Sequence, residues 1–104
     1  VGHTGVIDAI HKAVKTVDDC IGKLVECWLK NWYDLLVFAD HGNVEDQTPE
    51  RRTSHTTNPV PFIVVSNDKY ELRETWSLAD IAPTVLKILG IEKPAEMTGD
   101  SLIK

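Results

Sequence analysis

A hydrophobic pattern of helical period occupies the first third of the chain. Between positions 6 and 30, apolar side chains recur every three or four residues: Val6, Ile10, Ala13, Val14, Val17, Ile21, Leu24, Val25 and Trp28. Charged residues fill about half of the positions between them, so a helix formed by this segment would have one apolar and one polar face. The pattern therefore predicts a long amphipathic helix over residues 6–30, with Thr4 as its N-cap.

Two short apolar runs after this helix predict strands. Residues 34–39 contain the run Leu-Leu-Val-Phe-Ala, and residues 61–66 read Pro-Phe-Ile-Val-Val-Ser. Successive apolar residues are typical of a strand at the centre of an α/β sheet, where both faces are covered. We therefore expect a small, mainly buried sheet.

A polar segment without periodicity, residues 42–58, separates the two predicted strands. Loops of this length in compact domains are usually functional or disordered. This loop begins beside His41 and nearly ends at His55, which favours a functional role.

A second helix is expected from Ser77 or Asp80 to Leu89. Pro83 would then lie in its first turn, where proline is tolerated, and Gly90 would follow its end. The order of elements is helix, strand, long loop, strand and helix, which predicts an α/β fold.

Composition and charge exclude several classes of function. The chain has 104 residues, 42% of them hydrophobic, which fits one small domain. Its net charge of −5 disfavours a nucleic-acid or anionic-membrane partner, because such surfaces need clustered Lys and Arg. No apolar run approaches the roughly 20 residues of a membrane span. The chain opens at Val1 in a glycine-rich turn without an initiator Met, so we expect a piece of a longer polypeptide.

The two cysteines lie in the first predicted helix. Cys20 and Cys27 are seven positions apart and lack the two-residue spacing of a zinc or redox pair. We expect them to be buried thiols in a reducing compartment.

Four side chains that commonly bind metals come from three separate segments. Asp40 and His41 directly follow the first predicted strand, His55 precedes the second, and His3 lies in the glycine-rich start of the chain. Imidazole nitrogen combined with carboxylate oxygen suits Mn²⁺, Zn²⁺, Fe²⁺ or Co²⁺. Each residue alone could be a solvated or turn-forming side chain, but the combination predicts a metal site. Gly42 is expected to allow the backbone angles that bring such ligands together.

Four motifs occur in an order that matches a known family. Together they closely resemble the C-terminal part of the cofactor-independent (2,3-bisphosphoglycerate-independent) phosphoglycerate mutases, in the alkaline phosphatase superfamily. The resemblance covers essentially all 104 residues. The first and third motifs point narrowly to these mutases, whereas the other two are shared across the superfamily. The motifs are Val1-Gly2-His3-Thr4-Gly5, Ala39-Asp40-His41-Gly42-Asn43, His55-Thr56-Thr57-Asn58-Pro59-Val60-Pro61-Phe62 and Leu78-Ala79-Asp80-Ile81-Ala82-Pro83-Thr84.

The resemblance implies a fold, an activity and ligand roles. Residues 1–104 would be the C-terminal segment of a metal-binding, alkaline-phosphatase-like three-layer α/β/α domain, without its N-terminal part and the substrate-binding domain. The implied activity is the glycolytic, cytoplasmic interconversion of 3-phosphoglycerate and 2-phosphoglycerate through a phosphoserine, at two divalent ions, preferably Mn²⁺. By matching motifs, Asp40 and His41 would bind the ion that activates the serine, and His3 and His55 the second ion.

The resemblance also implies that essential parts lie outside this chain. The family's nucleophilic serine and two further aspartate ligands lie upstream, so no residue here is assigned as catalytic. We expect the chain alone to lack mutase activity and to self-associate through uncovered apolar surface. Two alternatives stay open, namely a fragment of another superfamily enzyme such as a phosphopentomutase, and a non-enzymatic metal-binding or self-associating module.

Overall fold

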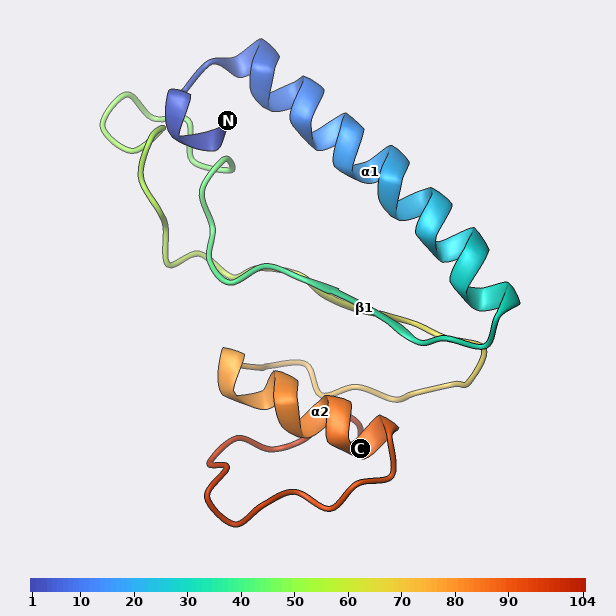
Figure 1. Cartoon of the computed structure of the whole chain (residues 1–104). Coiled ribbons are helices and arrows are strands. Elements are labelled where there is room, and N and C mark those ends of the chain that lie inside the picture. The colour runs from blue at the N-terminus through green and yellow to red at the C-terminus, as the bar shows by residue number, and fades with distance from the viewer. The chain divides into compact units, whose positions relative to one another are not determined.

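A computed structural model describes all residues, 1–104, and divides them into two compact units, Val1–Asn67 and Asp68–Lys104. The first unit contains a short 3-10 helix, a long helix and two strands, and the second contains a 3-10 helix followed by an α-helix. In chain order these are η1 (Gly2–Thr4), α1 (Ile7–Lys30), β1 (Leu35–Phe38), β2 (Phe62–Val65), η2 (Leu78–Asp80) and α2 (Ile81–Ile88) (Figure 1). The predicted mixed α/β class is confirmed. No helix combines the length and apolarity that a membrane span requires.

Helix α1 begins one residue later than the pattern predicted and is capped differently. Thr4 belongs to η1, where its hydroxyl donates to the Val1 carbonyl at 2.6 Å and accepts from the Val6 amide at 3.3 Å. Gly5 has a left-handed φ of 63°, which separates η1 from the helix. Val6 is the N-cap and provides no side-chain hydrogen bond. The prediction of Thr4 as N-cap was wrong because its hydroxyl serves the preceding turn.

The apolar face of α1 is only partly covered. Ile10 is 6% exposed, whereas Val14 and Val17 are 54% and 57% exposed. Cys20 and Cys27 are both exposed, so the prediction of buried thiols was wrong. Each cysteine directly precedes a residue of the apolar stripe, and one helical position turns its side chain by about 100° away from that stripe.

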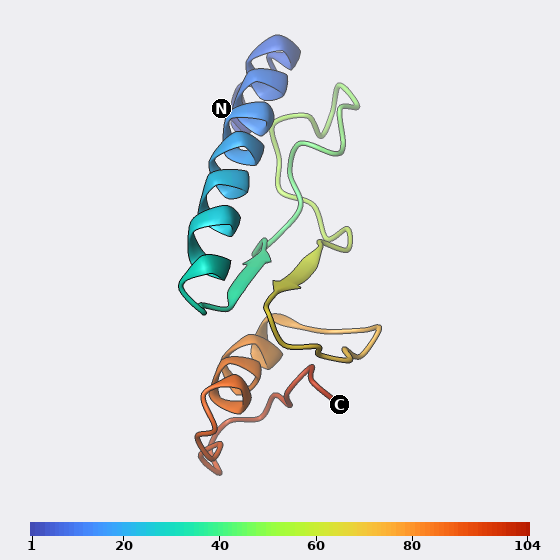
Figure 2. The ribbon, with the colours of Figure 1, turned by 90° about the vertical axis from the view of Figure 1, so that its right-hand side faces the viewer.

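Strands β1 and β2 pair antiparallel. Their register joins Leu35 to Val65 at one end and Phe38 to Phe62 at the other, where the two phenylalanine rings stack with centroids 6.0 Å apart. Figure 2 shows the two strands side by side in the first unit. Because the strands run in opposite directions, the segment that leaves β1 meets the segment that enters β2.

The sheet is half-buried, which corrects the expectation of a mainly buried one. Phe38 is 44% exposed and Ile63 is 49% exposed. Successive apolar residues place side chains on both faces of a strand. Two strands of four residues each cannot cover both faces by themselves.

In the second unit, η2 leads directly into α2. The Ser77 amide donates to Asp80 Oδ2 at 2.8 Å, and this contact is one half of a capping box at the start of η2. Pro83 lies in the first turn of α2, and Gly90 follows its end with a φ of 67°. These two features were predicted from the sequence.

The segment Asp80–Thr84 holds the C-terminal tail against α2. The fully buried Thr84 hydroxyl donates to the Asp80 carbonyl at 2.6 Å and accepts from the Leu102 amide at 2.9 Å. Asp80 Oδ1 accepts from the Asp100 amide at 2.9 Å, and this hydrogen bond is the main cause that lowers the pKa of Asp80. Leu102, which is 1% exposed, is the most buried apolar side chain.

Candidate metal centre

The antiparallel hairpin brings two of the predicted ligand-bearing segments together. Gly42 and Thr56 form an isolated antiparallel bridge, in which the Thr56 amide donates to the Gly42 carbonyl at 2.9 Å. The residues just before them in sequence are His41 and His55, whose rings stack with centroids 3.6 Å apart and an angle of 19°. The long loop therefore closes at its base, with both imidazoles beside the closure.

The start of the chain adds a third imidazole to this place. His3 Nε2 lies 3.2 Å from His55 Nε2, and His3 Nδ1 lies 2.7 Å from the Thr53 carbonyl oxygen. Asp40 completes the group, with its Oδ2 3.6 Å from His41 Nε2. The structure thus brings all four predicted ligands into one cluster within the first unit.

In His3 and His41, a backbone carbonyl determines which ring nitrogen carries the proton and which has the lone pair. His3 Nδ1 faces the Thr53 carbonyl, and His41 Nδ1 lies 3.0 Å from the Gly42 carbonyl. A carbonyl oxygen only accepts hydrogen bonds, so both Nδ1 atoms carry the proton. In a neutral ring the lone pair is then on Nε2, which in His3 faces His55 and in His41 faces Asp40. Metal-binding histidines show this arrangement, because the second nitrogen fixes the ring.

The spacing of the donor atoms fits two pairs of metal ligands. Two donor atoms that bind the same ion, each at about 2.0–2.2 Å, can be at most about 4.4 Å apart. The 3.2 Å between the Nε2 atoms of His3 and His55 meets this condition, as does the 3.6 Å between Asp40 Oδ2 and His41 Nε2. The pairs are those implied by the family resemblance, and their role as ligands stays a prediction.

Neither pair forms a closed site within this chain. No group of three or more His, Cys, Asp or Glu side chains has the geometry to hold one ion. The stacking of His41 on His55 is a physical reason, because nearly parallel rings direct their lone pairs along separate planes. The arrangement can therefore supply part of the coordination of an ion.

Gly42 has a different role from the one predicted. Its φ is not in the left-handed region, so the backbone conformation at this position does not require glycine. A Cβ atom at this position would instead collide with the Thr56 hydroxyl and the Glu45 carboxylate. These two groups pack against the Gly42 backbone, and a larger residue here would force both to move.

Sequence reasoning missed Glu45, which joins both sides of the loop. Its carboxylate accepts hydrogen bonds from the Thr56 hydroxyl, from Asn58 Nδ2 at 3.1 Å and from the Asn43 amide at 2.6 Å. These contacts, with the Thr56 hydroxyl first, lower the pKa of Glu45 to about 2. The loop contains a second glutamate, Glu50, and no sequence pattern distinguishes Glu45 from it.

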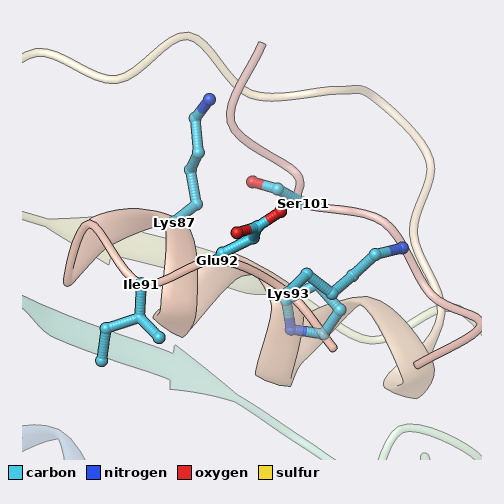
Figure 3. Close-up of a pocket in the computed structure, with 6 residues that line it drawn as sticks. Lys87, Ile91, Glu92, Lys93 and Ser101 are labelled. Atoms are coloured by element: carbon cyan, nitrogen blue, oxygen red, sulfur yellow. The ribbon is translucent and has the colours of Figure 1, made fainter. Parts of the chain in front are cut away.

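The second unit has a small hollow of a different kind. It has a volume of about 240 Å³ and is lined by Pro83, Lys87, Ile91, Glu92, Lys93 and Ser101 (Figure 3). Lys93 Nζ is already bonded to the Gly99 carbonyl at 2.7 Å and to Asp100 Oδ1 at 2.9 Å. No imidazole or thiol lines the hollow, so Ser101 has no histidine base there to activate it as a nucleophile.

Comparisons with known proteins identify the relatives of this chain. A family model described as the metalloenzyme superfamily matches residues 1–93. The chain is 55% identical to the 2,3-bisphosphoglycerate-independent phosphoglycerate mutase of Clostridium botulinum (strain Langeland), over 100% of this chain and 21% of that protein. It is 52% identical to the protein of the same name from Pseudomonas entomophila, over 99% of this chain and 21% of that protein. The resemblance inferred from the motifs is confirmed, and the chain spans about a fifth of the length of these relatives.

Proposed function

This chain belongs to the metalloenzyme superfamily, and we propose that it contributes part of the two-metal site of a 2,3-bisphosphoglycerate-independent phosphoglycerate mutase. The observation that carries this proposal is the cluster of four side chains at the closed base of the long loop. His3 and His55 form one pair, and Asp40 and His41 form the other. Both pairs have donor spacings compatible with one shared ion each.

The proposed reaction is the interconversion of 3-phosphoglycerate and 2-phosphoglycerate through a phosphoserine. The serine and the remaining ligands would come from polypeptide outside these 104 residues. Divalent ions, when bound, lower the pKa of a serine nucleophile and neutralise phosphate charge. Manganese is the proposed ion, because mixed imidazole and carboxylate ligands suit it.

The residues of this chain would hold and orient the ligand atoms. The carbonyls of Thr53 and Gly42 keep the protons of His3 and His41 on Nδ1, which leaves each Nε2 ready to bind an ion. Asp40 would add negative charge beside His41. The proposed partner of the complete enzyme is phosphoglycerate, with no nucleic acid or membrane, and the proposed location is the cytoplasm, where glycolysis takes place.

Metal binding by the chain itself tests the proposal. We expect Mn²⁺ to bind weakly, since each pair leaves several positions of an ion unfilled. Replacing His55 by Ala should weaken binding by about tenfold or more, because it removes one member of a pair. His11→Ala is the matched control, since His11 is exposed on α1 outside the cluster. Isothermal titration at neutral pH measures both variants, and equal affinities would contradict the proposal.

A mutase assay tests the expectation that this chain supplies metal ligands but no nucleophile. The chain with Mn²⁺ should show no interconversion of phosphoglycerates, because it has no activated nucleophile. Turnover that disappears in the His41→Ala variant would contradict this expectation.

A further inference from the structure

We propose that Glu45 is a positioning residue for His41 and His55. It clamps together the two stems of the long loop, which are the segment that leaves β1 and the segment that enters β2, and so fixes the two histidines relative to each other. The inference rests on the proposed function only in assigning metal binding to these histidines. The clamp itself is a property of the chain and has its own measurement.

The three hydrogen bonds to Glu45 come from both stems. Asn43, on the stem that leaves β1, donates its amide to Oε2 at 2.6 Å. Thr56 and Asn58, on the stem that enters β2, donate to Oε1 through their side chains. One carboxylate therefore links residues that are 11 and 13 positions away to its own stem.

The clamp lies very close to both histidines along the chain. Thr56 is 5% exposed and directly follows His55, and it forms the backbone bridge to Gly42, which directly follows His41. A movement of Thr56 relative to Gly42 would shift the two rings by a similar amount. Backbone misplacements of about 1 Å are large for metal and catalytic sites, whose geometry must be held within about 0.5 Å.

His55 depends on this support more than the other histidines do. His3 and His41 each have an Nδ1 anchored on a backbone carbonyl. The side chain of His55 instead contacts only the other two rings: its Nε2 bonds with His3, whose ring is tilted against it, and its ring stacks on His41. Its place is therefore set by its own backbone, which the Thr56 contacts hold.

A carboxylate suits this role better than a neutral side chain. Both oxygens of Glu45 accept hydrogen bonds, and bonds to an ionised acceptor are roughly twice as strong as neutral ones. The low pKa keeps Glu45 ionised at neutral pH. Glutamine could keep the bonds to Thr56 and Asn58 through its carbonyl, but its amide group cannot accept from the Asn43 amide.

The test compares three variants of the 104-residue chain. Glu45→Ala removes the clamp, Glu45→Gln removes half of it, and Glu50→Ala is the control, since Glu50 is an exposed glutamate of the same loop. The first readout is the nuclear Overhauser effect between the His41 and His55 ring protons, measured without metal. The second readout is Mn²⁺ affinity by isothermal titration. Far-ultraviolet circular dichroism checks that each variant keeps its helices.

The proposal expects a graded result. Glu45→Ala should lose the ring-to-ring signal and bind Mn²⁺ about 10–100-fold more weakly, Glu45→Gln should show a smaller loss, and Glu50→Ala should stay within about twofold of the parent. An unchanged ring-to-ring signal or an unchanged affinity in Glu45→Ala overturns the proposal. If Glu45→Ala loses its helical signal, Glu45→Gln is judged by the same criteria.

The two readouts separate this inference from the function on which it rests. If the parent chain binds no Mn²⁺ at all, the proposed function fails and the metal-free ring-to-ring signal alone judges the clamp. If the parent binds Mn²⁺ and Glu45→Ala binds it equally well, the clamp fails and the proposed function stands.

Discussion

At the residue scale, two glycines are required by close packing. Gly42 lies against Thr56 and Glu45, and Gly99 lies against the backbone of Ala79, with neither φ in the left-handed region. The absence of a Cβ atom lets another part of the chain come within contact distance. The sequence alone cannot distinguish this use of glycine from a turn, because Thr56 and Ala79 are distant from these glycines along the chain.

Replacing Gly99 by Ala should therefore destabilise the protein. The new Cβ would collide with the Ala79 carbonyl, which is backbone and cannot rotate away, so we expect a loss of about 1–3 kcal/mol in the free energy of unfolding. Urea denaturation followed by circular dichroism measures the change.

Gly22→Ala is the matched control for this substitution. Gly22 lies inside α1, and no neighbouring atom lies within 4 Å of the place that a Cβ atom would take there. Alanine should therefore stabilise the helix by about 0.5–1 kcal/mol. Equal effects of the two substitutions would contradict the packing argument.

At the element scale, the pattern of hydrophobic residues predicted where the helices and strands lie, but not how the strands pair. The bounds of α1, β1 and β2 agree with the predicted ranges to within a residue or two, because each pattern is local. The antiparallel direction of β1 and β2 was not predicted, because short apolar runs look the same in either direction. The burial of the strands and cysteines was predicted wrongly, since it depends on neighbours that the pattern does not specify.

For the candidate site, the sequence predicted the four candidate ligands but not Glu45. Asp40 and His41 were recognised because they directly follow the first predicted strand, and His55 because it begins a proline-framed segment that leads into the second. The antiparallel pairing explains why these segments meet. The family resemblance assigned Asp40 and His41 to one ion, and His3 and His55 to the other. Glu45 was not recognised, because its partners lie 11 and 13 residues away in a segment without periodicity.

The loop that joins β1 and β2 should lose stability in acid. The pKa of Glu45 is lowered from 4.5 to about 2 in the folded chain, so its contribution is complete above pH 4.5 and disappears as the pH falls from 4.5 towards 2. We expect Glu45→Gln to flatten the pH dependence of the thermal midpoint within this window. A variant curve parallel to that of the parent would show that Glu45 does not titrate with folding.

At the scale of the whole molecule, exposed apolar surface on α1 favours self-association. Val14, Val17 and Leu24 belong to one helical stripe and are 54%, 57% and 41% exposed. Helices with such a stripe usually bury it against another element. We expect sedimentation velocity to show oligomers at roughly tens of micromolar chain.

A charge on the stripe should oppose this association. Val17→Lys should shift the chain towards monomer, whereas Thr16→Lys, which adds the same charge off the stripe, should not. A stable monomer for the parent chain at these concentrations would refute the expectation.

The bridge between Gly42 and Thr56 has a consequence for how this region can evolve. A loop that is closed at its base by a backbone bridge can gain or lose residues at its tip while the base stays in place. Doubling the length of such a loop raises the entropic cost of closing it by only about 0.6 kcal/mol. Insertions near Glu50 should therefore be tolerated, whereas a single residue inserted beside Gly42 should shift His41 out of line with its neighbours.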